Sequence, residues 1–249
     1  MRVSAPNFAE LVGFPFTAVS ASENETHATT VLALRNSEGV LMLADRRATM
    51  GNLVMYDHAE KIEALDDSTL IAISGSFARS VEVCRFLKHS FKYYSRMHLQ
   101  EISMDGKLQE ITRALAQNMP MAMQGIGVFV PILAAYDNSR EEFGMYFFDG
   151  AGARFENSEY ACAGSGSERI RGIFEYLSRT KGPWETRPLK DVLVDGLRML
   201  DIAADLDSAT GGFTKVLPSA RLLGKGQNRM LAKGELEAAA KQVLAQSEL

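Results

Sequence analysis

The sequence predicts an α+β protein in which antiparallel sheets carry helices on their outer faces. Strand-like runs and helical periodicities come in blocks, with strands over residues 29–75, helices over 76–124, strands over 128–167 and helices over 167–206. Blocks of this kind favour antiparallel sheets over alternating βαβ units. A hydrophobic content of 46% is typical of a globular protein with a real core, and 249 residues suffice for one large domain or two small ones.

The first block opens with a predicted hairpin. The run "TTVLALR", which begins at Thr29, is rich in the β-branched and apolar residues that strands prefer. The turn residues "NSEG" follow, and "VLMLAD" returns as a second apolar run that ends in Asp45. Two further strand candidates complete the block, "KIEAL" from Lys61 and "TLIAISG" from Thr69.

Two amphipathic helices are expected next. Over residues 76–97 apolar side chains recur every three or four positions, and they are Phe77, Val81, Cys84, Leu87, Phe91 and Tyr94. Residues 106–124 repeat this spacing with Leu108, Ile111, Leu115 and Met119. Pro120 is expected to end or kink the second helix, because proline has no backbone N–H and its ring clashes with the preceding turn.

The second half of the chain repeats the order of strands followed by helices. Its strand-like runs span residues 128–137, 142–150 and 159–167. Its helix candidates span residues 167–180, 188–206 and 235–246. Pro188 stands near the first turn of the middle helix, where proline is tolerated. Residues 213–223 are predicted to form a late strand pair or an edge strand.

Charge and motif content argue against several function classes. A net charge of -4 shows no basic excess, so nucleic-acid binding is not expected. No run approaches the roughly 18 apolar residues of a membrane span. The 4 histidines do not cluster as metal ligands and no "GKS" or "GKT" phosphate loop occurs, so no metal or organic cofactor is expected. Cys84 and Cys162 lie in apolar runs and are expected to be buried free thiols in a reducing, cytoplasmic compartment.

The leader before Thr29 contains one apolar stretch, "LVGFPFTAVSA". The stretch resembles the core of a short signal peptide. However, Arg2 is the only basic residue of this region, Glu10 directly precedes the stretch and Pro15 interrupts it. Secretion is therefore not expected.

Thr29 is the candidate nucleophile. A hydroxyl is a weak nucleophile at neutral pH and needs a base close by. If the chain is cut between Ala28 and Thr29, the new α-amine belongs to the same residue as the hydroxyl, and its reference pKa of roughly 7.7–8.0 leaves a useful neutral fraction. The alternative is that Thr29 and Thr30 are ordinary β-branched strand residues. The side chain of Thr30 is expected on the opposite face of the strand, away from the chemistry.

The predicted strands position two charged residues to act on Thr29. Asp45 ends the returning strand of the hairpin, so it comes back beside the strand start, and Lys61 is the lone cation of a strand-like segment. A buried lysine held by Asp45 would place positive charge near the Thr29 hydroxyl and lower its pKa. Taken singly, each of the two residues is more often a solvated surface charge.

Five segments recur in an order that resembles one protein family. They are the hairpin "TTVLALRNSEGVLMLADRRAT", the "EK" before the next strand, "SGS" at 74–76, "AGSGS" at 163–167 and "DSATGG" at 207–212. Together they resemble the bacterial proteasome β subunits of actinobacteria and a few other lineages, over about residues 29–217. The Thr/Asp/Lys spacing combined with "DSATGG" is highly specific.

The resemblance implies an N-terminal-nucleophile hydrolase fold, a four-layer αββα sandwich of two antiparallel sheets between helix layers. It also implies a threonine endopeptidase. Thr29 would be the nucleophile, and its freed amine would accept the proton. Asp45 and Lys61 would orient and activate it.

Further roles follow from the same resemblance. Ser165 and Asp207 would support the amine, and Thr210 stands where many relatives have serine, a change that keeps the hydroxyl. Gly75 would offer its N–H to the tetrahedral intermediate, and Thr49 would pair with the extended substrate through its main chain. The pocket for the side chain before the cut would be lined by Ala48, Ile73 and Phe77.

The resemblance also implies maturation of the chain. Residues 1–28 would be a propeptide removed by self-cleavage between Ala28 and Thr29, leaving residues 29–249 as the catalytic domain. Relatives usually carry glycine before the nucleophile, and this chain has Ala28. The additional methyl group restricts the backbone there, so slower maturation is expected rather than none.

The implied assembly is a stack of rings. By resemblance, seven β subunits form a ring, two such rings stack, and rings of α subunits cap them. A ring-shaped ATPase would deliver polypeptide substrates, which in relatives often carry a small protein tag. Two alternatives stay open, namely a simpler bacterial proteasome-like peptidase and a non-catalytic structural subunit. The leader argues against the first, and intact Thr29, Asp45 and Lys61 argue against the second.

Overall fold

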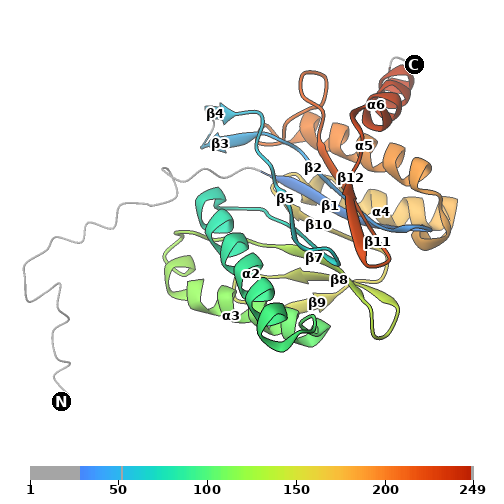
Figure 1. The fold of residues 1–249 in the computed structure, drawn as a ribbon. Helices are drawn as coiled ribbons and strands as arrows, with labels where there is room; N and C mark the ends of the chain where they lie inside the picture. Colours follow the sequence, from blue (N-terminus) through green and yellow to red (C-terminus); the bar gives the residue numbers. More distant parts are fainter. Residues whose placement is uncertain (1–28, 52, 248–249) are drawn as a thin grey trace, which may run out of the picture.

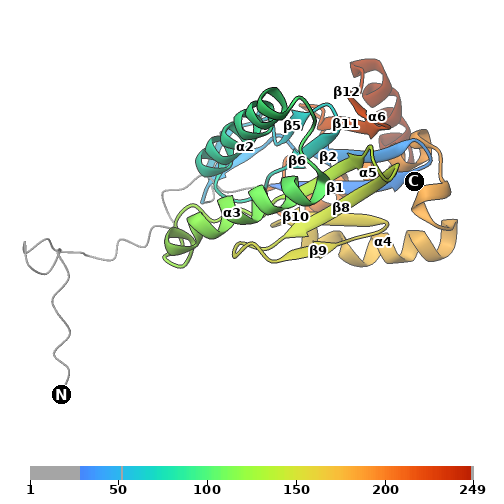
Figure 2. The ribbon, with the colours of Figure 1, turned by 60° about the horizontal axis from the view of Figure 1, so that its bottom comes forward.

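The computed structural model describes residues 29–51 and 53–247, and the predicted leader lies outside them. Two five-stranded antiparallel sheets face each other, and helices cover both outer sides (Figures 1 and 2). A small two-stranded sheet stands beside them. This arrangement confirms the α+β sandwich that the sequence predicts.

The first sheet is built around the predicted hairpin. Its strands, in the order β10-β1-β2-β11-β12, are β10 (Tyr160–Gly164), β1 (Thr30–Asn36), β2 (Gly39–Ala44), β11 (Ser219–Gly224) and β12 (Gln227–Met230). β1 begins at Thr30, one residue later than predicted, so Thr29 lies immediately before it. Because the turn returns the chain directly, Asp45 comes back beside the start of β1, where its N–H donates to the Thr30 carbonyl at 3.1 Å.

The second sheet has the order β5-β6-β7-β8-β9. Its strands are β5 (Ile62–Asp66), β6 (Thr69–Ala72), β7 (Ile132–Asp137), β8 (Glu142–Phe148) and β9 (Arg154–Glu156). The separate small sheet consists of β3 (Ala48–Met50) and β4 (Leu53–Tyr56). β9 and β10 are therefore edge strands of the two large sheets.

The helices form the outer layers, as Figures 1 and 2 show. The second sheet is covered by α2 (Phe77–His98) and α3 (Met104–Ala122). The first sheet is covered by α4 (Ser167–Lys181) and α5 (Leu189–Leu206), and α6 (Lys233–Ser247) packs on α5. A short 3-10 turn, η2 (Trp184–Thr186), precedes α5. α3 contains Pro120 but ends only at Ala122, because a proline this close to the helix end disturbs few backbone hydrogen bonds.

Both faces of β1 are buried, which explains its continuous apolar sequence. Alternate side chains of a strand point to opposite faces. Leu32 and Leu34 pack against the helix layer, whereas Val31 and Ala33 pack between the two sheets. A strand that is covered on both sides loses the alternation of polar and apolar residues that a half-exposed strand shows.

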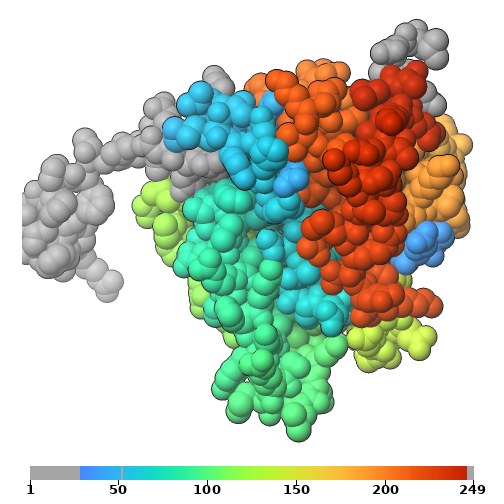
Figure 3. All heavy atoms as spheres, turned by 45° about the horizontal axis from the view of Figure 1, so that its top comes forward, coloured from blue at the N-terminus to red at the C-terminus, as the bar shows by residue number. Residues whose placement is uncertain are grey.

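Four short strands, β3, β4, β9 and β12, have no counterpart in the sequence-based prediction. β3 and β4 form a hairpin, and every side chain of β4 is exposed, Leu53 and Tyr56 included. In the space-filling view this light-blue hairpin lies at the surface beside the orange chain around α5 (Figure 3). β9 has 3 residues, all exposed. Strands this short are fixed by their neighbours, because they contain too few residues to show a period of their own.

The late strand pair predicted over residues 213–223 forms only in part. β11 begins at Ser219, directly after Pro218, and its hairpin partner is β12, beyond the predicted range. Proline cannot donate a ladder hydrogen bond, so it marks the start of the strand.

The two cysteines were expected to be buried free thiols. Cys84 is free and buried as expected, whereas Cys162 is free but only half-buried.

A buried lysine ties α3 to the hairpin of β5 and β6. Lys107 is 3% exposed. Its ammonium donates to Ser68 Oγ and Thr69 Oγ1, both at 2.8 Å, and lies 2.8 Å from Asp66 Oδ2. A buried cation is costly unless it is paired and hydrogen-bonded, so these three partners determine where α3 docks.

We expect Lys107→Ala to lower the free energy of unfolding by about 3 kcal/mol, because it leaves Asp66 Oδ2 and the hydroxyl oxygens of Ser68 and Thr69 without the lysine donor. The matched control is Arg113→Ala on the same helix. The Arg113 side chain is 56% exposed and pairs with Glu110 at the surface, so its loss should cost less than about 0.5 kcal/mol. Urea unfolding measures both values. Equal midpoints would show that Lys107 does not tie the helix to the sheet.

Candidate active site

The carboxylate of Asp45 is the centre of the first buried network. The residue is 1% exposed. Its Oδ1 accepts from the Thr30 backbone N–H at 2.8 Å and from Lys61 Nζ at 2.7 Å. Its Oδ2 accepts from the backbone N–H groups of Arg47 at 3.0 Å and Gly211 at 2.9 Å. The structure thus brings together Asp45 and Lys61, as the sequence predicts, and Asp45 also binds the first residue of β1.

Lys61 is buried with its partner. It is 1% exposed, and its ammonium also donates to the Arg47 carbonyl at 2.6 Å. Burial lowers the pKa of Lys61 from its ordinary value, and the charge of Asp45 opposes that change. The pair therefore places a desolvated positive charge beneath the start of β1, where it favours an ionised oxygen close by.

The carboxylate of Asp207 is the centre of a second network. Its Oδ2 accepts from Ser165 Oγ and from Thr210 Oγ1, both at 2.6 Å. These three residues come from the "AGSGS" loop and from the "DSATGG" loop after α5, so the structure joins segments that lie 42 residues apart in sequence. With its own proton directed to Asp207, the Ser165 oxygen keeps lone pairs that can accept from an ammonium group.

Thr30 joins this second network, which the sequence did not indicate. Thr30 Oγ1 lies 2.7 Å from Thr210 Oγ1. Because Thr210 gives its single proton to Asp207, Thr30 must be the donor in this hydrogen bond. The expected alternation along β1 is correct, since Thr30 points to the helix-covered face. Thr210, a candidate site residue, lies on that face, so the Thr30 hydroxyl contacts the candidate site.

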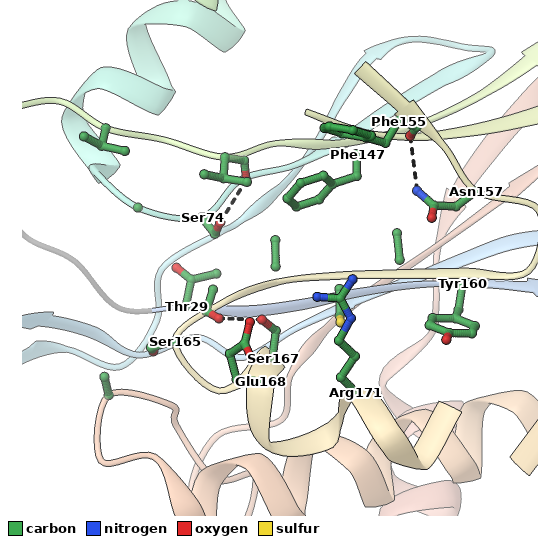
Figure 4. Close-up of a pocket in the computed structure, with 18 of the residues that line it drawn as sticks. Thr29, Ser74, Phe147, Phe155, Asn157, Tyr160, Ser165, Ser167, Glu168 and Arg171 are labelled. Atoms are coloured by element: carbon green, nitrogen blue, oxygen red, sulfur yellow. Dashed lines mark hydrogen bonds between the residues drawn. The ribbon is translucent and has the colours of Figure 1, made fainter. Parts of the chain in front are cut away.

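Thr29 directly precedes Thr30, the residue that is hydrogen-bonded to both networks. It is 5% exposed, and Figure 4 shows it beside Ser165 at one end of a cavity. A Cβ atom on Gly164 would come within 1.8 Å of the Thr29 carbonyl oxygen, and the φ of Gly164 is +101°. Only glycine allows the "AGSGS" loop to approach the candidate nucleophile this closely.

Gly75 is positioned as an anion-binding donor. It forms an isolated antiparallel bridge with Phe129. The flanking bonds run from Ser76 N–H to the Val128 carbonyl and from Val130 N–H to the Ser74 carbonyl, both at 2.8 Å. In this pattern the N–H of the central residue points away from the partner segment, here toward the cavity that Gly75 lines. Such an N–H can stabilise a developing oxyanion.

A cavity of about 950 Å³ opens at Thr29 (Figure 4). Thr49, Ser74 and Gly75 line it near the candidate nucleophile. The three residues predicted for the pocket before the cut, Ala48, Ile73 and Phe77, are not among its lining residues. Ala48 and Ile73 are buried, at 6% and 2% exposure. Their role in substrate selection stays a prediction.

Arg47 is a further residue that the sequence analysis missed. Its guanidinium donates to the carbonyls of Ser208 and Thr210, both at 3.3 Å, and to Asp57 Oδ1 at 3.1 Å. It therefore fastens the "DSATGG" loop to the turn after Asp45. One feature of the sequence could have indicated this role. Arg47 stands two residues after Asp45, where its side chain can reach the carbonyls of the "DSATGG" loop.

Within residues 29–51 and 53–247, the structure shows no group of three or more His, Cys, Asp or Glu side chains arranged to hold a metal ion. In the same part of the chain, no helix is long and apolar enough to cross a membrane.

Comparison with known proteins gives a consistent result. A family model described as "Proteasome subunit" matches residues 25–215. The chain is 33% identical to a "Proteasome subunit beta" of Streptosporangium roseum over 216 residues, which is 83% of this chain and 74% of that protein. Over 228 residues it is 33% identical to the protein of the same description from Acidothermus cellulolyticus, covering 88% of this chain and 76% of the relative. A similar match to Streptomyces griseus covers 75% and 64%.

The hydroxyl of Thr30 is open to a direct test. We expect Thr30→Val to lower kcat/KM for peptide hydrolysis about tenfold, because it keeps the side-chain shape but leaves the buried Thr210 oxygen without its donor. Thr30→Ser restores the hydroxyl and should return the rate to near that of the wild type. Steady-state kinetics on a fluorogenic peptide compares the three proteins. A Thr30→Val protein with wild-type kinetics would place this hydroxyl outside the site.

Proposed function

This chain belongs to the proteasome subunit family, and from that premise we propose that it is a catalytic β subunit that hydrolyses peptide bonds with Thr29 as nucleophile. Proteasome β subunits are generally threonine peptidases. The observation that carries the proposal is the convergence of two buried networks on the start of β1, one centred on Asp45 and the other on Asp207.

The first chemical step is attack by the Thr29 hydroxyl. Once the chain is cut before Thr29, the α-amine and the hydroxyl belong to one residue, and the neutral amine accepts the hydroxyl proton as Oγ1 attacks the scissile carbonyl. The charge of Lys61, held by Asp45 at 2.7 Å, favours the ionised oxygen. Ser165 accepts from the resulting ammonium, and Asp207 holds the Ser165 hydroxyl in the orientation that permits this.

The tetrahedral intermediate and the ester follow. The Gly75 N–H stabilises the oxyanion. When the intermediate collapses, the C–N bond of the peptide breaks and the ammonium of Thr29 gives its proton to the leaving amine. A water molecule then attacks the ester with the amine again as base, which releases the acid and regenerates Thr29. Every proton moves between Thr29, substrate and water, so the reaction consumes only water.

Maturation uses the same nucleophile, but its first step lacks the free amine. We infer that residues 1–28, which lie outside the described residues, are removed when the Thr29 hydroxyl attacks the carbonyl of Ala28. The Ala28–Thr29 C–N bond breaks as an ester forms, the hydroxyl proton passes to the released nitrogen through water, and the new α-amine then serves as the base while water hydrolyses the ester. Alanine in place of the glycine of relatives slows this step. We infer that the leader assists assembly, because its stretch "NFAELVGFPF" is rich in apolar side chains that favour burial against other subunits.

Membership of the family implies assembly into rings with α subunits. We infer the finer arrangement from the resemblance, with seven copies in each β ring, two stacked β rings and an α ring at each end, acting in the cytoplasm. A ring-shaped ATPase delivers unfolded polypeptides, some of which carry a protein tag. Neither nucleic acid nor membrane takes part.

The nucleophile assignment predicts a sharp difference between two substitutions. We expect Thr29→Ala to abolish both leader removal and peptide hydrolysis while rings still assemble, because it removes the attacking oxygen together with one methyl group and leaves the backbone of β1 unchanged. Thr29→Ser keeps the oxygen and should retain measurable activity. Mass spectrometry of the β N-terminus and hydrolysis of a fluorogenic peptide are the two measurements. Peptide cleavage by Thr29→Ala particles at the wild-type rate would exclude Thr29 as nucleophile.

The pocket predicted for the side chain before the cleaved bond leads to a second test of substrate preference. Ala48, Ile73 and Phe77 are uncharged, so a charged side chain placed there would lose several kcal/mol through unpaired burial. We expect fluorogenic peptides that end in Leu, Tyr or Phe to be cleaved faster than peptides that end in Arg or Asp. Faster cleavage after Arg would mean that other residues form this pocket.

A further inference from the structure

The cavity extends well beyond Thr29, between the edge strands of the two large sheets. β10 is the last strand of the first sheet and β9 the last strand of the second. Phe147 and Phe155, from β8 and β9, line one side of the cavity, and residues 160–164 of β10 line the other (Figure 4). Arg171 of α4 reaches into the space between them (Figure 4). This region is continuous with the candidate active site.

The free edge of β10 presents backbone groups to this cavity. Arg35 N–H donates to the Glu159 carbonyl at 2.8 Å, which fixes the register of β1 against β10. In an antiparallel ladder, residues bonded to the partner strand alternate with residues whose N–H and C=O point the other way. Tyr160, Cys162 and Gly164 are therefore directed away from β1. The Gly164 carbonyl agrees with this, since it accepts from Ser167 Oγ at 2.7 Å.

Two charges stand at the rim of this region. Glu168 and Arg171 both line the cavity and are exposed. Figure 4 shows the Arg171 side chain between Thr29 at one end of the cavity and Tyr160 at the other, beside the middle of β10. Burial raises the pKa of the Cys162 thiol to about 11, the positive charge of Arg171 opposes this rise, and the negative charge of Glu168 adds to it. Glu168 is one helical turn nearer the start of α4, on the side of Thr29 in Figure 4. An extended chain that leaves Thr29 along β10 would meet Glu168 first and Arg171 later.

We propose that this part of the cavity binds the leaving-group side of the polypeptide substrate as an extended strand paired with the free edge of β10, and that Arg171 binds an acidic side chain on it. Cys162, in the middle of β10, precedes Ser165 by three residues, which is about 10 Å along a strand. An extended substrate beside β10 covers the same distance in about three residues, so we place the acidic side chain about three residues after the cut. The inference rests on the proposed function. It adds where the second half of the substrate lies and which charge it prefers.

The cavity beside β10 fits the part of the substrate after the cut better than the part before the cut, which is the acyl side. Figure 4 shows Thr29 and Ser74, the neighbour of Gly75, at the opposite end of the cavity from Tyr160. The residues predicted to bind the side chain before the cut do not line the cavity. The leader is the acyl group in self-cleavage, so it shares that side. The part of the substrate after the cut therefore runs from Thr29 along β10.

Backbone pairing is tested with assembled wild-type particles and internally quenched peptides that carry five residues after a fixed cleavage site. A single N-methyl group is placed on the second, third, fourth or fifth of these residues, and mass spectrometry confirms the cut. We expect kcat/KM to fall about tenfold at alternate positions only, because every second N–H faces β10. Equal kcat/KM across the series would overturn the pairing.

The role of Arg171 is tested with peptides that carry Glu or Lys three residues after the cut. We expect wild-type particles to favour the Glu peptide about tenfold, Arg171→Ala to remove the preference and Arg171→Glu to reverse it. Arg169→Ala on the same helix is the matched control, since Arg169 is exposed and does not line the cavity, and it should keep the wild-type ratio. An unchanged ratio in both Arg171 variants would overturn the assignment.

One further substrate separates this inference from the proposed function. A peptide ending in an aminocoumarin has no residues after the cut. If wild-type particles do not hydrolyse it and Thr29→Ala changes nothing, the proposed function itself fails. If they hydrolyse it while the N-methyl series is flat, the proposed function stands and the β10 inference fails.

Discussion

The buried carboxylate of Asp45 is the constraint on which the site depends. An anion removed from water is stable only when it is fully hydrogen-bonded and neutralised. Asp45 meets this condition with four donors, and each comes from a different part of the chain: Thr30, Arg47, Lys61 and Gly211. Because one group must satisfy all four, the start of β1, the turn after β2, the approach to β5 and the loop after α5 have fixed relative positions.

Thr30 couples this anion to the second one. Its backbone N–H binds Asp45, and its hydroxyl binds Thr210, which in turn binds Asp207. The residue after the candidate nucleophile is thus held by main chain on one side and by side chain on the other. In the proposed mature form no residue precedes Thr29, so the two hydrogen bonds of Thr30 help to hold Thr29 in place. A β-branched hydroxyl residue suits both the strand and the hydrogen bond.

The two-sheet architecture also explains why the site is accessible. Central strands such as β1 and β7 are buried on both faces, so no extended chain can reach them. β9 and β10 lie at the edges, where each strand has an unpaired side and the space between the sheets opens. Unpaired edges normally invite aggregation. Here they border the cavity next to Thr29, where a substrate can use the same backbone groups.

The sequence by itself determined the local elements and the chemical type of the site. The apolar runs of β1 and β2 and the spacing of α2 and α5 are periodic over a few residues, so they predict strands and helices without reference to the rest of the chain. Asp45 comes beside Thr30 for an equally local reason, because a short turn returns the strand. Only the tertiary structure decided the contact of Thr30 with Thr210, 180 residues away, the burial of Lys107, and the cavity between β9 and β10. Periodicity tells which face of an element a side chain occupies, but the packing of the layers decides what covers that face.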